Sequence, residues 1–120
     1  MLTFAHLAIF VKNVDAMEQF YQEIFSMKTV WKNPNDKAYL TTGNNDIFAL
    51  VQHKNLKEKE TVLDGYVLAN ASHFGVIVDS EEEFEKLVKR IQERGIRIAG
   101  PKKSRDNTTS FYFLDPDKNP

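Results

Sequence analysis

Residues 6–21, HLAIFVKNVDAMEQFY, decide the fold, because the same pattern returns in residues 73–88, HFGVIVDSEEEFEKLV. Each stretch begins with a histidine, continues through an apolar segment, and passes a capping residue into an amphipathic stretch with helical spacing. The two copies lie 67 residues apart and align without a gap through the helix. We therefore predict a duplicated strand–helix unit with His6 and His73 at equivalent strand positions. Equivalent strands can bring both imidazoles to one internal axis, as a divalent metal ion requires.

The composition restricts the class of protein. The chain has 120 residues, of which 42% are hydrophobic, so it suits one compact domain, 1–120, with a real core. Its 16 basic and 17 acidic residues leave no positive surplus for nucleic acid. The chain has no cysteine, no signal-peptide pattern, and no apolar run near the ~20 residues that span a bilayer. We expect a cytoplasmic protein that contacts neither nucleic acid nor membrane.

The first half of the chain, residues 1–53, predicts a β-α-β-β-β module. Its opening strand, Leu2–Lys12, is apolar on both faces and is expected to be buried on both sides. Asn13 is a candidate N-cap for the helix that follows. Helical spacing relates the apolar positions that should face the core, namely Val14, Met17, Tyr21 and Ile24. The three remaining strands are predicted at 27–32, 37–42 and 46–53, with turns at 33–36 and 43–45.

Residues 54–70 look like a linker, and residues 71–120 like a second, incomplete module. A strand is predicted at 72–79, then a helix that begins with a capping box of Ser80 and Glu83 and ends at Gly95. Short strands are predicted at 96–99 and 108–114, and a turn at 115–119. Nothing in this second module matches the fourth strand of the first. We expect the native chain to continue past Pro120, or its last strand to be missing from this chain.

Three motifs resemble the vicinal oxygen chelate superfamily, which includes glyoxalase I, bleomycin-resistance proteins, extradiol dioxygenases and fosfomycin-resistance transferases. They are His6 followed by the Phe20–Tyr21 pair, the stretch 73–79 (HFGVIVD), and the stretch 111–120 (FYFLDPDKNP). The last is similar to the family's Phe-x-Asp-Pro-Asp-Gly-Asn-Pro ending. The resemblance implies an α+β fold of two βαβββ modules that form a half-open mixed barrel around a metal cleft, commonly in a homodimer.

The resemblance also implies the metal ligands. His6 and His73 would bind one divalent ion (Fe, Mn, Ni or Zn), and the third ligand would be a Glu just beyond Pro120. Glyoxalase-like members add a carboxylate at the position of Ala49, so their four-ligand pattern does not fit this chain. Two His and one Glu leave coordination positions open, where a substrate can bind through two adjacent oxygens.

Further residues are candidates for substrate contact. Tyr112 is the candidate catalytic residue, although it could equally be a wall tyrosine whose hydroxyl reaches water. Lys102 and Ser110, with Tyr112, match the phosphonate-binding segment of the fosfomycin transferases. That branch is weakened by Ala8, where those enzymes carry a threonine, and by residues 106–109, which replace their potassium loop. The candidate pocket wall, aromatic or polar, consists of Trp31, Tyr39 and Gln52, of which Gln52 could instead face solvent.

These inferences favour a metal-dependent enzyme that acts on a small oxygenated molecule through bidentate chelation. Its reaction class stays open among lyase or isomerase, ring-cleaving dioxygenase and thiol transferase. The alternative is a metal-free binding protein of the bleomycin-resistance type, which has no need of His6 and His73.

Overall fold

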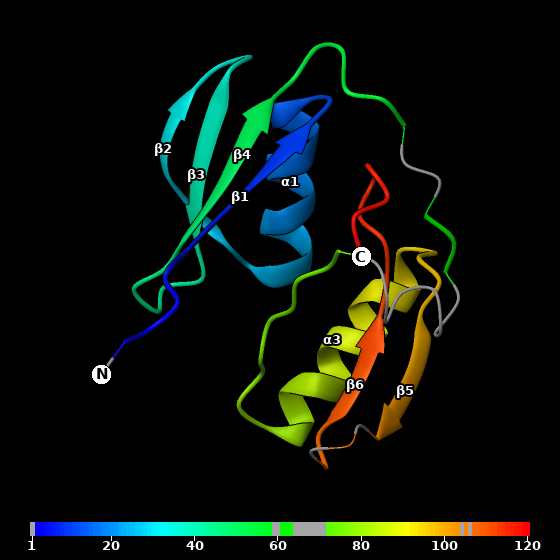
Figure 1. Ribbon diagram of the computed structural model, residues 1–120. Coiled ribbons are helices and arrows are strands. Elements are labelled where there is room, and N and C mark those ends of the chain that lie inside the picture. The colour runs from blue at the N-terminus through cyan, green and yellow to red at the C-terminus, as the bar shows by residue number, and fades with distance from the viewer. Residues whose placement is uncertain (1, 59–60, 64–71, 104, 106) are drawn as a thin grey trace. The chain divides into compact units, whose positions relative to one another are not determined.

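The computed structural model describes residues 2–58, 61–63, 72–103, 105 and 107–120, and its chain divides into two units (Figure 1). Unit 1 covers residues 1–57 and unit 2 covers residues 58–120. The predicted linker, 54–70, lies in large part outside the described residues. Among the residues described, no helix is both long and apolar enough to cross a bilayer.

Unit 1 has the predicted β-α-β-β-β order. Its sheet has the strand order β1-β4-β3-β2, in which β1 and β4 are parallel and the other neighbours are antiparallel. A parallel pair at one edge of an otherwise antiparallel sheet follows from the helix that connects β1 to β2. The elements are β1 (His6–Val11), α1 (Val14–Phe25), β2 (Lys28–Asn33), β3 (Lys37–Thr41) and β4 (Ile47–Gln52).

Helix α1 begins and packs as its sequence predicts. The Asn13 side chain accepts a hydrogen bond from the Ala16 N–H at 2.9 Å, which satisfies a backbone donor of the first turn. The Tyr21 ring meets the Phe48 ring of β4 edge to face, with centroids 4.7 Å apart. The buried residues of the helix are the four predicted ones, Val14, Met17, Tyr21 and Ile24.

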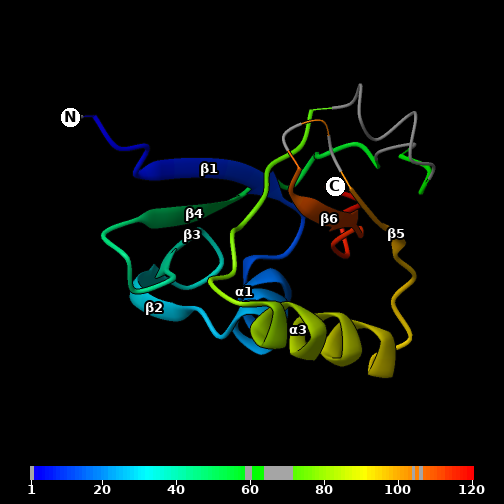
Figure 2. The same cartoon turned by 90° about the horizontal axis from the view of Figure 1, so that it is seen from below.

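The sheet of unit 1 has one covered face and one open face, so the prediction that β1 is buried on both sides is wrong. Figures 1 and 2 both show α1 along one side of the four strands. On β1, His6, Ala8 and Phe10 are exposed, whereas Val11 is fully buried. Strand β1 is also shorter than predicted, because β4 begins at Ile47, whose N–H donates the last ladder bond to the Ala5 carbonyl at 2.7 Å. We call the side opposite α1 the open face.

Unit 2 contains α3 (Glu81–Glu93) and an antiparallel pair, β5 (Ala99–Lys103) and β6 (Thr109–Tyr112). The capping box is confirmed at its first half, since the Ser80 hydroxyl accepts from the Glu83 N–H at 3.2 Å. Gly95 follows α3 with a φ of +73°, as the predicted helix end requires. Phe84 of α3 meets Phe111 of β6 edge to face, so Phe111 lies on the helix side of β6.

Two strands predicted for unit 2 are wrong. Residues 72–78 contain no assigned strand, although the equivalent β1 does. In unit 1 that strand pairs with β4, and the described part of unit 2 has no counterpart of β4 to provide the ladder. The strand predicted at 96–99 instead begins at Ala99 and runs on to Lys103, because the chain first completes the cap of α3 through the Ile96 N–H. Strand β6 ends at Tyr112, two residues earlier than predicted.

Candidate functional site

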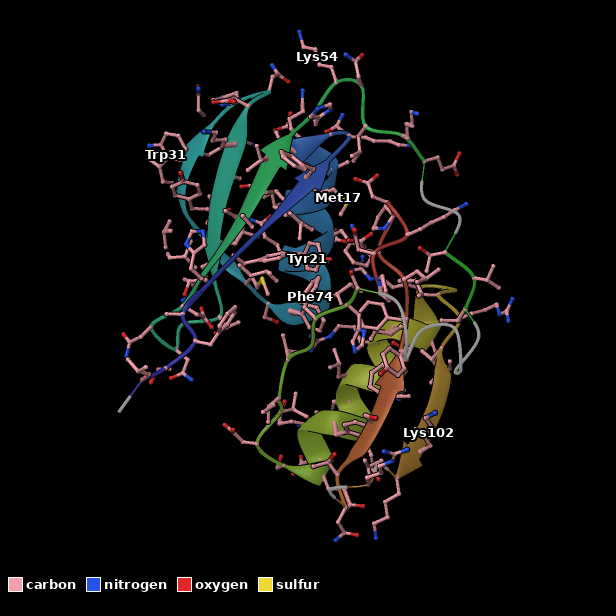
Figure 3. The ribbon with its side chains drawn as sticks, viewed as in Figure 1. Met17, Tyr21, Trp31, Lys54, Phe74 and Lys102 are labelled. Carbon is pink, nitrogen blue, oxygen red and sulfur yellow. The ribbon has the colours of Figure 1, made fainter. Side chains whose placement is uncertain are left out.

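The candidate residues of unit 2 gather on one face of the β5–β6 pair. Ser110 and Tyr112 alternate with Phe111, which packs on α3, so both lie on the opposite face. Lys102 is the register partner of Ser110. The His73 ring meets the Tyr112 ring edge to face, with centroids 5.4 Å apart. Lys102 is therefore a cross-strand neighbour of Ser110, and the His73–Tyr112 ring pair lies two residues further along β6 (Lys102 is labelled in Figure 3).

A bulge in β5 determines which residues of β5 and β6 are partners. Lys102 pairs with Ser110 and Ala99 with Tyr112, so the two residues 100 and 101 oppose the single residue Phe111. Gly100 has a φ of +107°, and a Cβ there would lie 3.1 Å from the Ser110 carbonyl oxygen. Only glycine fits both the conformation and the space. The sequence signal for this bulge was the Gly100–Pro101 pair, which lies between the strands predicted at 96–99 and 108–114.

In unit 1, His6 stands on the open face at the edge strand β1. Its side chain makes no hydrogen bond or ion pair to any residue that the structure describes. Ala8, two residues along the same face, pairs with Ala49 of β4, and Ala49 also pairs with Tyr39 of β3. Because both alanine side chains are small, they leave space on the open face between His6 and the aromatic side of the sheet.

Trp31 and Tyr39 form that aromatic side. They are register partners on β2 and β3, with ring centroids 4.9 Å apart. Tyr39 alternates with Ala38 and Leu40, which are fully buried on the α1 side, so Tyr39 lies on the open face. Trp31 is 47% exposed. The structure thus brings together the two aromatic residues predicted for a pocket wall.

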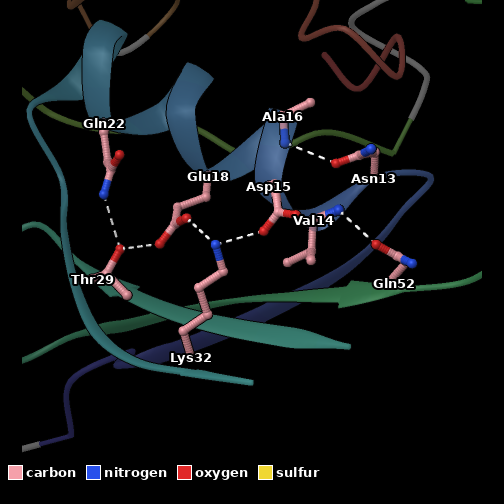
Figure 4. A network of polar contacts seen from close by, with 9 residues as sticks. All are labelled: Asn13, Val14, Asp15, Ala16, Glu18, Gln22, Thr29, Lys32 and Gln52. Carbon is pink, nitrogen blue, oxygen red and sulfur yellow. Dashed lines mark hydrogen bonds and ion pairs between the residues drawn. The ribbon is translucent and has the colours of Figure 1, made fainter. Parts of the chain in front are cut away.

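Gln52 lies apart from this wall. It is the register partner of the fully buried Val11, and its side-chain oxygen accepts a hydrogen bond from the Val14 N–H at 3.0 Å (Figure 4). This bond satisfies a free backbone donor in the first turn of α1. The geometry therefore gives Gln52 a role in starting the helix, which spacing within β4 alone did not reveal.

Each unit contains one of the two histidines predicted to bind a metal ion. His6 belongs to unit 1 and His73 to unit 2, and in the described segments no group of three or more His, Cys, Asp or Glu side chains could hold an ion. Imidazole nitrogens suit a divalent transition ion, and the unbonded, exposed His6 fits such a role. Two imidazoles alone make an incomplete set, so a further ligand is required.

Fold and sequence agree on the class of protein. The sequence profile of the Glyoxalase/Bleomycin resistance protein/Dioxygenase superfamily matches residues 3–120. The chain therefore belongs to this superfamily, and its α+β fold is glyoxalase-like, as predicted.

The chain is also similar to individual proteins of known sequence or structure. The chain is 29% identical over 112 residues to the glutathione transferase FosA of Serratia marcescens, across 93% of this chain and 72% of FosA. It superposes on an integron cassette protein, HFX_CASS4, from the Halifax Harbour sewage metagenome with a TM-score of 0.78, at 23% identity, over 99% of this chain and 94% of that one. A mutant of the Listeria monocytogenes fosfomycin resistance protein FosX, solved with Mn(II) and 1S,2S-dihydroxypropylphosphonic acid, has a TM-score of 0.73 at 16% identity, over 99% and 88% of the two chains.

Proposed function

We propose that this protein is a divalent-metal-dependent enzyme that acts on a small phosphonate, as a thiol transferase or a close relative of one. The observation that carries the proposal is the common face of Lys102, Ser110, Tyr112 and His73 in unit 2. A phosphonate carries negative charge and several acceptor oxygens, so a lysine beside two hydroxyls suits it. The likeness to FosA over 93% of the chain supports this choice among the branches of the superfamily.

Each residue has a defined task in this proposal. Lys102 pairs with the phosphonate, and Ser110 donates a hydrogen bond to one of its oxygens. Tyr112 directs its hydroxyl at a second substrate oxygen, while its ring fixes the His73 imidazole by the edge-to-face contact. Trp31 and Tyr39 of unit 1 are proposed as an apolar wall of the substrate pocket.

His6 and His73 would hold the metal ion, together with a further ligand. When bound, the ion supplies Lewis acidity to a substrate oxygen. The absence of a carboxylate at Ala49 argues against the four-ligand glyoxalase pattern in this chain. Assembly as a homodimer is also proposed on the pattern of the superfamily, and a cytoplasmic location on the sequence composition.

The test is calorimetric titration of the protein with Mn²⁺, and then with fosfomycin in the presence of Mn²⁺, followed by an assay of glutathione consumption. We expect one Mn²⁺ per chain, lost in His6→Ala and in His73→Ala but kept in His53→Ala. Lys102→Met should weaken fosfomycin binding by about tenfold, as expected for a charge-assisted hydrogen bond. Lys103→Met is the matched control, because Lys103 pairs with Thr109 and alternates to the other face.

Two outcomes would contradict the proposal. Wild-type protein that takes up no Mn²⁺ would remove the metal site. Ligand binding that is equally strong with and without a chelator, and equal in the His6→Ala variant, would favour the metal-free binding protein instead.

A further inference from the structure

Strand β2 contains a bulge beside the aromatic wall. Thr29 pairs with Leu40, but Trp31 pairs with Tyr39, so Val30 has no partner on β3. An extra residue in one strand breaks the alternation of its side chains. Thr29 and Lys32, three positions apart, therefore both turn toward α1, whereas Val30 and Trp31 are both exposed, at 55% and 47%.

One carboxylate bridges the two residues that flank the bulge. Glu18 of α1 accepts the Thr29 hydroxyl at 2.5 Å with one oxygen and the Lys32 ammonium at 2.8 Å with the other (Figure 4). The Glu18 side chain is only 13% exposed and that of Lys32 28%. Because both bonds are charge-assisted and partly shielded from water, they constrain β2 more than a surface ion pair would.

Two further contacts hold the same bridge in place. The Lys32 ammonium also lies 2.5 Å from an Asp15 oxygen, and Gln22 donates to the Thr29 hydroxyl at 3.0 Å. Hydrogen bonds to Asp15 and then to Glu18 raise the pKa of Lys32 above its ordinary 10.5. The lysine therefore stays charged at neutral pH, and the network spans nearly two turns of α1.

We infer that Glu18 is a positioning residue for Trp31. By holding Thr29 and Lys32 from the helix side, it fixes the bulge and so the direction in which Trp31 leaves the sheet to pack against Tyr39. This positioning role does not depend on which ligand the protein binds. Its consequence for ligand affinity rests on the proposed function, in which Trp31 and Tyr39 are the pocket wall.

Trp31 is the single tryptophan of the chain, so intrinsic fluorescence reports on this position alone. The variants are Glu18→Leu, which removes both bonds, and Glu18→Gln, which keeps an acceptor and loses the charge. We expect the acrylamide quenching constant of metal-free Glu18→Leu to change about twofold and its fast anisotropy decay to grow, since side chains freed from contacts move on the nanosecond scale. Glu18→Gln should lie between wild type and Glu18→Leu.

The matched control is Glu23→Leu, because Glu23 lies on the same helix and its carboxylate accepts a hydrogen bond from Gln19, one turn earlier on α1. It should leave the Trp31 signals at wild-type values. If Glu18→Leu does not fold, Thr29→Val and Lys32→Met each remove one half of the bridge and serve the same test. Unchanged quenching and anisotropy in the folded variants would overturn the inference.

Ligand binding separates this inference from the proposed function. With Mn²⁺ bound, Glu18→Leu should raise the KM for the phosphonate by up to about tenfold, because one aromatic contact with the ligand is lost. Its kcat should stay near the wild-type value. A KM equal to that of wild type would overturn the link to the pocket wall. Failure of the proposed function would show as absent Mn²⁺ and phosphonate binding in the wild type, and would leave the Trp31 measurements intact.

Discussion

The His73 ring lies edge-on against the Tyr112 ring, at a centroid distance of 5.4 Å and an interplanar angle of 77°. This geometry is favourable for aromatic pairs, and it leaves the tyrosine hydroxyl outside the ring contact. Tyr112 is half-buried on the face that it shares with Ser110. A proposed metal ligand and a proposed substrate contact are thus coupled within one unit.

The Tyr112→Phe variant tests the contribution of the Tyr112 hydroxyl separately from that of its ring. The variant keeps the contact with His73, so metal affinity and the melting temperature should match wild type. Fosfomycin affinity should fall about fivefold to tenfold, because one hydrogen bond to a charged group is lost. Tyr112→Ala, which also removes the ring, should weaken the metal site. Unchanged fosfomycin affinity in Tyr112→Phe would show instead that the residue is a wall tyrosine whose hydroxyl reaches water.

Gly100→Ala should destabilise the protein more than Gly95→Ala. Both positions have positive φ, but a Cβ at Gly95 meets nothing within 4 Å, whereas one at Gly100 would press on the backbone of β6. We expect losses of about 1 kcal/mol at Gly95 and about 2–3 kcal/mol at Gly100 in urea unfolding. The Gly100 variant should also lose phosphonate affinity, since the bulge sets Lys102 opposite Ser110. Equal losses at both positions would contradict the close approach of β5 and β6.

Gln52→Leu tests the helix-starting role of Gln52. Loss of its acceptor leaves the part-buried Val14 N–H without this partner, so the free energy of unfolding should fall by about 1–2 kcal/mol. Ligand affinity should not change, because Gln52 lies on the α1 side of the sheet. Asn13→Ala, which removes the N-cap of the same helix, should cost a similar amount and provides the comparison. Weaker ligand binding in a fully folded Gln52→Leu variant would contradict this prediction and would support a place for Gln52 in the pocket wall.

The parts of the fold that local chemistry determines were predictable from the sequence. Asn13 and Ser80 begin their helices as expected, because a side-chain acceptor next to an amphipathic run is a local signal. The bulges at Val30 and at Gly100–Pro101 were not predicted, since a register shift depends on the partner strand. The same limit applies to residues 72–78: their apolar sequence predicts a strand, but the described part of unit 2 offers no partner strand for it.

The candidate site follows a similar division. Trp31 pairs with Tyr39, and Lys102 with Ser110, so residues proposed for the same surface are neighbours across their strands. Glu18 could not be found in that way, because its partners Thr29 and Lys32 lie on another element and face it only through the bulge. A glutamate on an amphipathic helix is ordinarily a solvated residue, so its role appears only in three dimensions.

The loop between β3 and β4 should make stability depend on pH through Asp46. Its carboxylate accepts the Thr42 hydroxyl in a short bond, the Thr42 N–H at 2.9 Å and the Thr41 hydroxyl at 2.9 Å. These bonds favour the charged form, and the largest cause, the Thr42 hydroxyl, lowers the pKa of Asp46 from its ordinary 3.8. A carboxyl whose pKa is lower in the folded state than in the unfolded state adds stability above the unfolded pKa, and this contribution is lost as the pH falls through the folded pKa.

Thr42→Val should therefore lower the free energy of unfolding at pH 7 by no more than about 1 kcal/mol, because the exposed loop is screened by solvent. The difference from wild type should shrink as the pH falls below about 4, because Asp46 is protonated first in the unfolded state and then, at lower pH, in the folded state. Urea unfolding at pH 7, 5, 4 and 3 measures this. Asp79→Asn, at an exposed aspartate without a hydrogen bond among the residues described, is the control and should show no such convergence. A difference between Thr42→Val and wild type that stays constant down to pH 3 would mean that the threonine acts through packing rather than through the charge of Asp46.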